Sequence, residues 1–237
     1  MKSLREIFYS LTKFADKWDP YFDVYETWFS RFRGQAPRIL EIGVQHGGSA
    51  EMWLEYFGPG TQIVGVDIDK RCLQHASSSV EVVLGDQEDP KFWIEFFAKH
   101  PEPFDIILDD GGHRMNQMII TFVMTSEHVR DGGIYLVEDV HTAYWNHYSI
   151  FWPGPWDDFG LYNTKNIMEF TKMGLDVLNR EHIEPHVGKI PQLDPTVLKT
   201  FEHVKSVHYY NSMIVFEIGK QQEFKRCLNS GTRMLEN

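Results

Sequence analysis

Two pairs of adjacent carboxylates are the residues in this chain best suited to bind a cation. Asp109 and Asp110 close one expected strand, and Glu138 and Asp139 close the following one. If these strands are neighbours, four carboxylates converge at one sheet edge, where their oxygens suit Mg²⁺. Successive strand side chains point to opposite faces, so either the chain bends at the strand ends or some carboxylates do other work. The pairs predict a metal site, with solvated loop acids and helix caps as the alternative.

His113 follows Asp110 by three residues, past Gly111 and Gly112. This spacing puts an imidazole beside the expected ion, and a histidine is the natural general base for a hydroxyl near neutral pH. With eleven histidines in the chain, one alone carries little weight. The alternative is a loop or helix-start histidine with no chemical task, but the neighbouring acid pairs favour the base.

A glycine loop after the first expected strand indicates a ligand site at the same edge. Glu41, Gly43, Gly47 and Ser49 form the pattern Glu-x-Gly-x-x-x-Gly-x-Ser, and glycines let the backbone approach a ligand closely. The spacing is neither the Gly-x-Gly-x-x-Gly of nicotinamide sites nor a Walker loop, since no Lys precedes Ser49. Such a loop alone is weak evidence, because turns also contain glycines.

Polar residues end the next two expected strands as well. Asp67 lies about 20 residues beyond the loop, where a carboxylate hydrogen-bonds a ribose in such folds, although a helix N-cap explains Asp67 alone equally well. Asp86 and Gln87 end the third strand. Ligands bind beyond the carboxyl ends of strands in doubly wound sheets, so the three polar strand ends together favour an adenosine ligand.

The elements that must position these residues alternate between strand and helix patterns. Expected strands cover residues 38–42, 62–67, 80–84, 104–110, 134–138, 204–210 and 212–218. Expected helices between or after them cover about 49–57, 89–97, 116–129 and 163–180. Alternation of this kind is typical of a parallel sheet with helices on both faces. The last two strands are joined tightly and are expected to pair antiparallel.

The fold expected from this order is α/β: a Rossmann-like, doubly wound, mostly parallel seven-stranded sheet with a C-terminal antiparallel strand pair. The helical spacing of apolar residues within 1–36 predicts an N-terminal helical extension, which begins with a capping box at Ser3 and Glu6. Residues 37–237 would then form one domain. Residues 140–165 interrupt the alternation and are expected to be a lid-like insertion, since long irregular segments in compact domains are usually functional.

The composition excludes several classes of protein. The chain has 237 residues, 42% of them hydrophobic, and a net charge of −11, so it can bury a core but lacks the basic surface of nucleic-acid or membrane-surface binding. Two distant cysteines, Cys72 and Cys227, make no disulfide framework or zinc knuckle. No apolar run is long enough to cross a bilayer, and the N-terminus does not resemble a signal peptide. A cytoplasmic protein is expected.

With these motifs the chain resembles class I S-adenosylmethionine-dependent methyltransferases of the Mg²⁺-dependent natural-product branch. This branch includes macrolide-sugar O-methyltransferases and the methyltransferase-like cephalosporin hydroxylases. The glycine loop is generic to class I methyltransferases, whereas Asp-Asp-Gly-Gly-His with Glu-Asp-x-His-Thr is much more specific. The matching stretches span most of the chain: residues 16–17, 21, 24–26, 40–47, 65–67, 85–87, 109–113, 137–142 and 209–217.

The resemblance implies a role for each candidate residue. The cofactor S-adenosylmethionine would contact Glu41, Gly43, Gly47 and Ser49 at its methionine end, Asp67 at its ribose, and Asp86 and Gln87 at its adenine. Mg²⁺ would bind Asp110, Glu138 and Asp139, with His113 as the general base. Asp109 would contact either the cofactor's amino group or the metal.

The resemblance also implies an acceptor, a small hydroxylated molecule such as a sugar or polyketide natural product. Three protein carboxylates leave about three positions open on an octahedral Mg²⁺, which leads to the hypothesis that the acceptor is a vicinal diol, either a sugar 2,3-diol or a catechol. His141, Tyr144 and Trp145, with Trp152 and Trp156 further along, are candidates for acceptor contact. Packing against a neighbouring subunit explains these aromatics almost equally well, so a homo-oligomer is expected.

Two other functions remain open at this point. A nicotinamide-dependent oxidoreductase fits a similar sheet, but the glycine spacing and the acid pairs argue against it. A non-catalytic S-adenosylmethionine-binding partner of a hydroxylase would carry the same binding residues, so the sequence does not exclude it.

Overall fold

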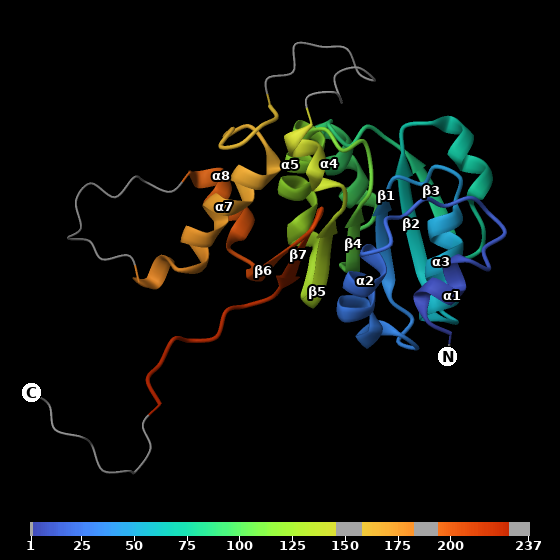
Figure 1. The fold of residues 1–237 in the computed structure, drawn as a ribbon, viewed down its shortest axis with the longest axis horizontal. Helices are drawn as coiled ribbons and strands as arrows, with labels where there is room; N and C mark the ends of the chain where they lie inside the picture. Colours follow the sequence, from blue (N-terminus) through green and yellow to red (C-terminus); the bar gives the residue numbers. More distant parts are fainter. Residues whose placement is uncertain (1, 146–157, 183–193, 228–237) are drawn as a thin grey trace, which may run out of the picture.

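The computed structural model describes residues 2–145, 158–182 and 194–227, which form a sheet covered by helices on both faces (Figure 1). The strand order is β3-β2-β1-β4-β5-β7-β6. The strands are β1 (Arg38–Ile42), β2 (Gln62–Asp67), β3 (Val80–Leu84), β4 (Phe104–Asp109), β5 (Val129–Val137), β6 (Val204–Tyr210) and β7 (Met213–Ile218). Within the described residues, β7 alone runs antiparallel to the others. The predicted mostly parallel seven-stranded sheet with a C-terminal antiparallel pair is confirmed.

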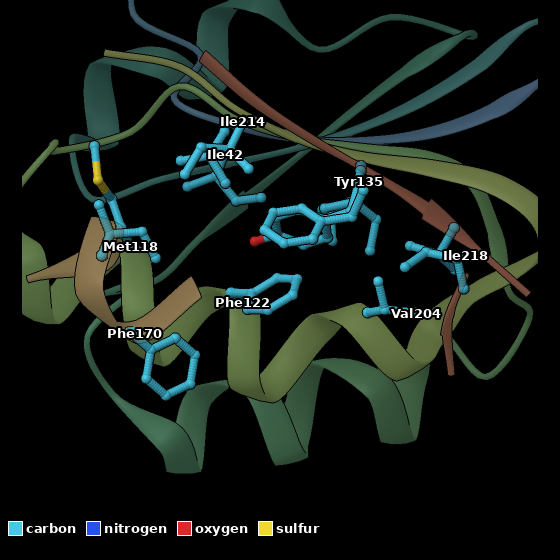
Figure 2. Close-up of a cluster of buried hydrophobic side chains, with 14 of the residues drawn as sticks. Ile42, Met118, Phe122, Tyr135, Phe170, Val204, Ile214 and Ile218 are labelled. Atoms are coloured by element: carbon cyan, nitrogen blue, oxygen red, sulfur yellow. The ribbon is translucent and has the colours of Figure 1, made fainter. Parts of the chain in front are cut away.

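One face of the sheet is covered by α4, α5, α7 and α8. These helices are α4 (Pro90–Lys99), α5 (Met115–Thr125), α7 (Ile167–Leu178) and α8 (Pro195–Phe201). Figure 2 shows the core beneath them, where the rings of Phe122 on α5 and Tyr135 face each other. Phe122 meets Tyr135 edge to face and stacks on Phe216 with ring centroids 4.3 Å apart. Ile42 of β1 reaches this core together with Ile214 and Ile218 of β7. β1, β2, β5 and β7 contribute alternate residues to it, as the two-residue period of a strand requires.

The other face is covered by α1 (Leu4–Phe8), α2 (Tyr21–Phe29) and α3 (Gly48–Phe57). Tyr25 and Phe29 of α2 pack on Trp53 of α3 with ring centroids 5.1 and 5.5 Å apart. All three side chains are fully buried. The residues expected to form a helical extension therefore share one hydrophobic core with the sheet.

Local signals explain where these helices begin. Ser3 and Glu6 form the predicted capping box, and the side chain of Asp89 caps α4 in front of its first-turn proline. The helix expected over 163–180 begins later, at Ile167, because Asn166 caps it by accepting from the amide of Glu169. α3 begins at Gly48, after Gly47 takes a left-handed φ of +73°.

Short 3₁₀ turns link several elements: η1 (Ser30–Phe32), η2 (Lys70–His75), η3 (Ser126–His128), η4 (Val140–Tyr144) and η5 (Arg180–His182). The insertion expected over 140–165 begins with η4, and the amide of Gly160 returns to the carbonyl of Ala143 at 2.7 Å. Residues 146–157, which include Trp152 and Trp156, lie outside the described part of the chain. Among the described helices, none combines the length and apolar character that crossing a membrane demands.

Phe122→Ala tests the core under α4 and α5. The substitution removes a fully buried ring and leaves a cavity, so we expect the free energy of unfolding to fall by about 3–5 kcal/mol. Ile94→Ala on α4, where the side chain is 63% exposed, is the control and should change stability by less than about 1 kcal/mol. Urea denaturation followed by circular dichroism measures both. Equal losses from the two variants would contradict the placement of Phe122.

Candidate active site

A cleft of about 920 Å³ lies beyond the carboxyl ends of the central strands. The strand order reverses between β1 and β4, and ligands bind at such a switch point in doubly wound sheets. The predicted site residues that line the cleft are Gly43, Ser49, Asp67, Asp86, Gln87, Asp110, His113, Glu138, Asp139, His141 and Trp145. Glu41, Gly47, Asp109 and Tyr144 lie outside this lining.

The glycine loop packs directly on the β4 strand end. Gly43 has φ +96°, and a Cβ there would lie 2.1 Å from the backbone oxygen of Asp110, so no other residue fits. The carboxylate of Asp67 holds the same loop, since its Oδ2 accepts from the amides of Val44 at 2.9 Å and Gln45 at 3.0 Å. Asp67 also borders the cleft, where a carboxylate oxygen has further capacity to accept hydrogen bonds.

Glu41 lies buried beneath the loop. Its Oε1 accepts from the indole of Trp53 at 3.0 Å, while its Oε2 has no hydrogen-bond partner. Burial raises the pKa of Glu41 to about 7, although the charge of Lys17 and hydrogen bonds from Trp53 and Ser49 act in the opposite direction. An unpartnered buried oxygen is costly, which is consistent with a carboxyl that keeps its proton until the pH approaches about 7.

Asp109 belongs to a second buried network, with Gln87. Its Oδ1 accepts from Gln87 Nε2 at 3.1 Å, and Oε1 of Gln87 accepts from the amide of Gly112 at 2.7 Å. Burial raises the pKa of Asp109 to about 7, and its Oδ2 has no partner. Through Gln87, Asp109 supports the turn that carries His113.

The structure brings Asp110, His113 and Asp139 together. One ligand atom from each lies within 4.8 Å of the others. His113 Nε2 is 3.4 Å from Asp139 Oδ2 and 3.8 Å from Asp110 Oδ1. Two oxygens and one imidazole nitrogen at this spacing can bind a divalent cation, or the imidazole can accept a proton beside one.

The backbone bends where the two strands end. Asp139 and His113 both have φ +55°, in the left-handed region, which costs about 1–2 kcal/mol for a residue with a side chain. This bend turns Asp139 away from the alternation of β5 and toward Asp110. Strained residues of this kind cluster at functional sites.

Glu138 points into a buried ion pair. Its Oε2 accepts from the ammonium of Lys17 at 2.8 Å, its Oε1 accepts from the hydroxyl of Tyr25, and the same ammonium contacts Asp110 Oδ2. Burial lowers the pKa of Lys17, but Asp110 and Glu138 more than reverse this and keep it well above its usual range. Burial and Asp110 raise the pKa of Glu138, which Lys17 opposes.

The sequence analysis assigned no role at the site to four residues that lie there: Lys17, Trp18, Tyr21 and Tyr25. Lys17, Tyr21 and Tyr25 fall in stretches that match the methyltransferase resemblance, which was the available signal, but no chemistry followed from their spacing. The hydroxyl of Tyr21 donates to Asp139, and burial raises its pKa, so it stays protonated. Lys17 lies 93 positions from Asp110 and 121 from Glu138, and Tyr21 lies 118 from Asp139.

Aromatic side chains form the outer edge of the cleft. His141 meets Trp145 with ring centroids 4.0 Å apart and Trp18 with centroids 5.9 Å apart. Trp18 is 56% exposed. The Nδ1 of His141 shares a hydrogen bond with the hydroxyl of Ser212, and burial lowers the pKa of this imidazole. The group offers flat apolar faces next to the acidic residues.

Comparisons with known proteins find methyltransferases. A methyltransferase-domain model matches residues 40–140. Demethylmacrocin O-methyltransferase of Streptomyces fradiae is 33% identical over 212 residues, covering 84% of this chain and 48% of the relative. Mycinamicin VI 2''-O-methyltransferase of Micromonospora griseorubida is 40% identical over 129 residues, covering 51% of this chain and 31% of the relative.

Among solved structures, the MycE methyltransferase of the mycinamycin biosynthetic pathway, in complex with Mg and SAH, superposes with a TM-score of 0.73. It is 27% identical, over 92% of this chain and 55% of that chain. The chain thus spans about half the length of the first curated relatives it matches.

Glu41→Gln tests the buried carboxyl beneath the glycine loop. The pKa of Glu41 is about 7 in the folded protein and about 4.3 in an unfolded chain. Between these pH values the folded state binds the extra proton, so the contribution of Glu41 to stability is greatest at low pH and falls as pH rises to about 7. We expect wild-type stability to fall more between pH 5 and pH 8 than that of Glu41→Gln.

Chemical denaturation at the two pH values measures this difference. Glu95→Gln is the matched control, because Glu95 is exposed, and it should keep the wild-type slope. An unchanged slope in Glu41→Gln would show that this carboxyl is ionised in the folded state.

Proposed function

We propose that the protein is an S-adenosylmethionine-dependent O-methyltransferase. A methyltransferase-domain model matches residues 40–140, and the chain has the Rossmann-like methyltransferase fold. The proposed acceptor is a hydroxyl of a sugar or polyketide natural product, and the proposed metal is Mg²⁺. The observation that carries the proposal is one continuous cleft that joins the glycine-loop edge to the Asp110, His113 and Asp139 cluster.

The residues of the cluster fit a hard divalent cation. Carboxylate oxygens converge there from two strand ends, and Asp110 and Glu138 already hold a cation, the ammonium of Lys17. When bound, S-adenosylmethionine and Mg²⁺ would supply an electrophilic methyl group and Lewis acidity that favours loss of the hydroxyl proton. Asp110 and Asp139, with Glu138 once its Oε2 is available, would hold the ion.

His113 is assigned as the general base. Its Nε2 would accept the proton of the acceptor hydroxyl, and Asp139 at 3.4 Å would then stabilise the imidazolium that forms. The bent backbone at His113 holds the imidazole toward the cleft. General-base catalysis contributes about 10²–10⁴-fold to a rate, and holding the reacting groups in line contributes more.

The other half of the cleft is assigned to the cofactor. Asp67 would accept from the ribose hydroxyls, while Asp86 and Gln87 would border the adenine. Gly43, Gly47 and Ser49 would allow the methionine end to approach the backbone, above the buried Glu41. Asp109 acts through Gln87 on the turn before His113 and is assigned a positioning role, without contact to the metal.

The acceptor is proposed to lie against the aromatic edge. Two of the relatives are O-methyltransferases named for mycinamicin VI and for a rhamnosyl tetracenomycin-C. Flat faces of Trp18, His141 and Trp145 suit stacking on a sugar ring. A vicinal diol is proposed because neighbouring oxygens can occupy adjacent open positions of an octahedral ion.

His113→Ala tests the assigned base and separates an enzyme from an accessory binding protein. We expect kcat for methyl transfer from labelled S-adenosylmethionine to fall about 10²–10⁴-fold, while the Kd for S-adenosylhomocysteine changes less than about twofold. His100→Ala, at the end of α4 and away from the cleft, is the control and should keep wild-type kcat. Full activity in His113→Ala would reject the base assignment, and no transfer by the wild type to any glycoside would favour the accessory role.

Matched acceptors test the diol. In the presence of Mg²⁺, a glycoside with two adjacent hydroxyls should be methylated at least about tenfold faster than its mono-deoxy analogue, because the analogue forfeits one metal contact. Product formation is measured by mass spectrometry with Mg²⁺ and with chelator. Equal rates for diol and analogue would argue against chelation and leave the O-methyltransferase assignment intact.

A further inference from the structure

Lys17 places a positive charge inside the acidic cluster. Its side chain is 2% exposed, and its ammonium contacts Asp110 Oδ2 and Glu138 Oε2. Burying an ammonium is costly unless carboxylates pair with it. The carboxylates in turn need a cation, because Asp110, Glu138 and Asp139 would otherwise repel one another at this edge.

Lys17 belongs to an irregular segment, residues 11–18, which we call the strap. The strap links α1 to α2. Near its start, the amides of Thr12 and Lys13 donate to the carboxylate of Glu51 at 2.9 and 3.0 Å. Further on, a Cβ at Gly48 would lie 2.3 Å from the carbonyl oxygen of Phe14, so the strap crosses directly over the start of α3.

The strap also borders the cleft, from Phe14 to Trp18. No helix or strand hydrogen bonds hold Lys17 itself, since it precedes α2. Its side chain can therefore leave the carboxylates without unfolding a regular element. The carboxylates have less freedom, because Asp110 directly follows β4 and the Oε1 of Glu138 is held by Tyr25.

A divalent ion that binds Asp110 together with Glu138 needs an oxygen that the ammonium now occupies. Two cations within a few ångströms repel strongly in a buried site, so both cannot remain on the same oxygens. The higher charge of the divalent ion gives it the stronger attraction to the three carboxylates.

We propose that Lys17 is an internal cation that holds Asp110 and Glu138 together in the metal-free protein, and that a divalent ion binds by displacing it. This inference rests on the proposed function for the identity of the ion as Mg²⁺. It makes Lys17 a positioning residue that sets metal affinity, and it links metal binding to a segment that borders the cleft.

Lys17→Met tests the displacement without cofactor or acceptor. Methionine is of similar length but uncharged, so the ion no longer competes with an ammonium. We expect Mn²⁺, followed by electron paramagnetic resonance, to bind at least about tenfold more tightly to Lys17→Met than to wild type. In chelator, Lys17→Met should melt at a lower temperature than wild type, and added Mg²⁺ should raise its Tm by more.

Lys13→Met is the matched control. Lys13 lies in the same strap but is exposed, so this variant loses the same charge and should keep wild-type Mn²⁺ affinity and Tm. Unchanged or weaker Mn²⁺ binding in folded Lys17→Met would overturn the proposal, as would equally tightened binding in both variants or no Mn²⁺ binding to any of the proteins.

If Lys17→Met does not fold in the presence of chelator, the displacement is tested on the wild-type protein instead. Amine acetylation followed by peptide mass spectrometry should find Lys17 protected in chelator and modified at least about fivefold faster with saturating Mg²⁺, because displacement frees a buried amine. Lys13 serves as the internal reference, with a constant rate. Equal protection of Lys17 in both conditions would overturn the proposal.

Failure of the two proposals can be told apart. If Mg²⁺ displaces Lys17 but the protein methylates no acceptor, only the methyltransferase assignment is contradicted. If methyl transfer requires Mg²⁺ but Lys17 stays protected, only the displacement proposal is contradicted.

Discussion

The charge of three carboxylates at one buried edge is the constraint on which the rest of the structure depends. Asp110, Glu138 and Asp139 come from two neighbouring strand ends, and each needs a partner when it is taken out of water. The partners come from the N-terminal segment: Lys17 contacts Asp110 and Glu138, Tyr25 contacts Glu138, and Tyr21 contacts Asp139. The docking of α2 on the sheet is thus tied to the same acids that would hold a metal.

The glycine-loop half of the cleft and the acidic half are joined by close backbone contact. Gly43 touches the backbone of Asp110, and Gln87 links the third strand end to the turn before His113. A shift at either half would therefore be transmitted to the other over a few bonds. This arrangement suits a reaction between two bound molecules, since both must be held at a defined distance.

Backbone strain is concentrated where the chemistry is expected. The backbones of His113 and Asp139 occupy the left-handed region. The pairing of β4 with β5 beneath them offsets the free-energy cost of these two conformations. Both strands are buried on both faces, by the core around Phe122 and by the core around Trp53. A rigid sheet lets two unfavourable backbone conformations persist and aim side chains into the cleft.

Much of this protein was predictable from the chain alone. The alternation of apolar strands with helices determined the parallel sheet, because such patterns have few other ways to bury their apolar residues. The polar residues at each strand end followed from the same pattern, and so did their meeting at one edge. The resemblance to methyltransferases added the expected role of each.

Only the tertiary structure decided which partner each acid has. Lys17 and Glu138 are 121 positions apart, and no local pattern links an irregular strap to the end of β5. Strand periodicity alone also could not show that Asp109 accepts a hydrogen bond from Gln87. Local sequence determines how a segment folds and which face it buries, whereas side-chain pairing across distant segments depends on how the finished elements pack.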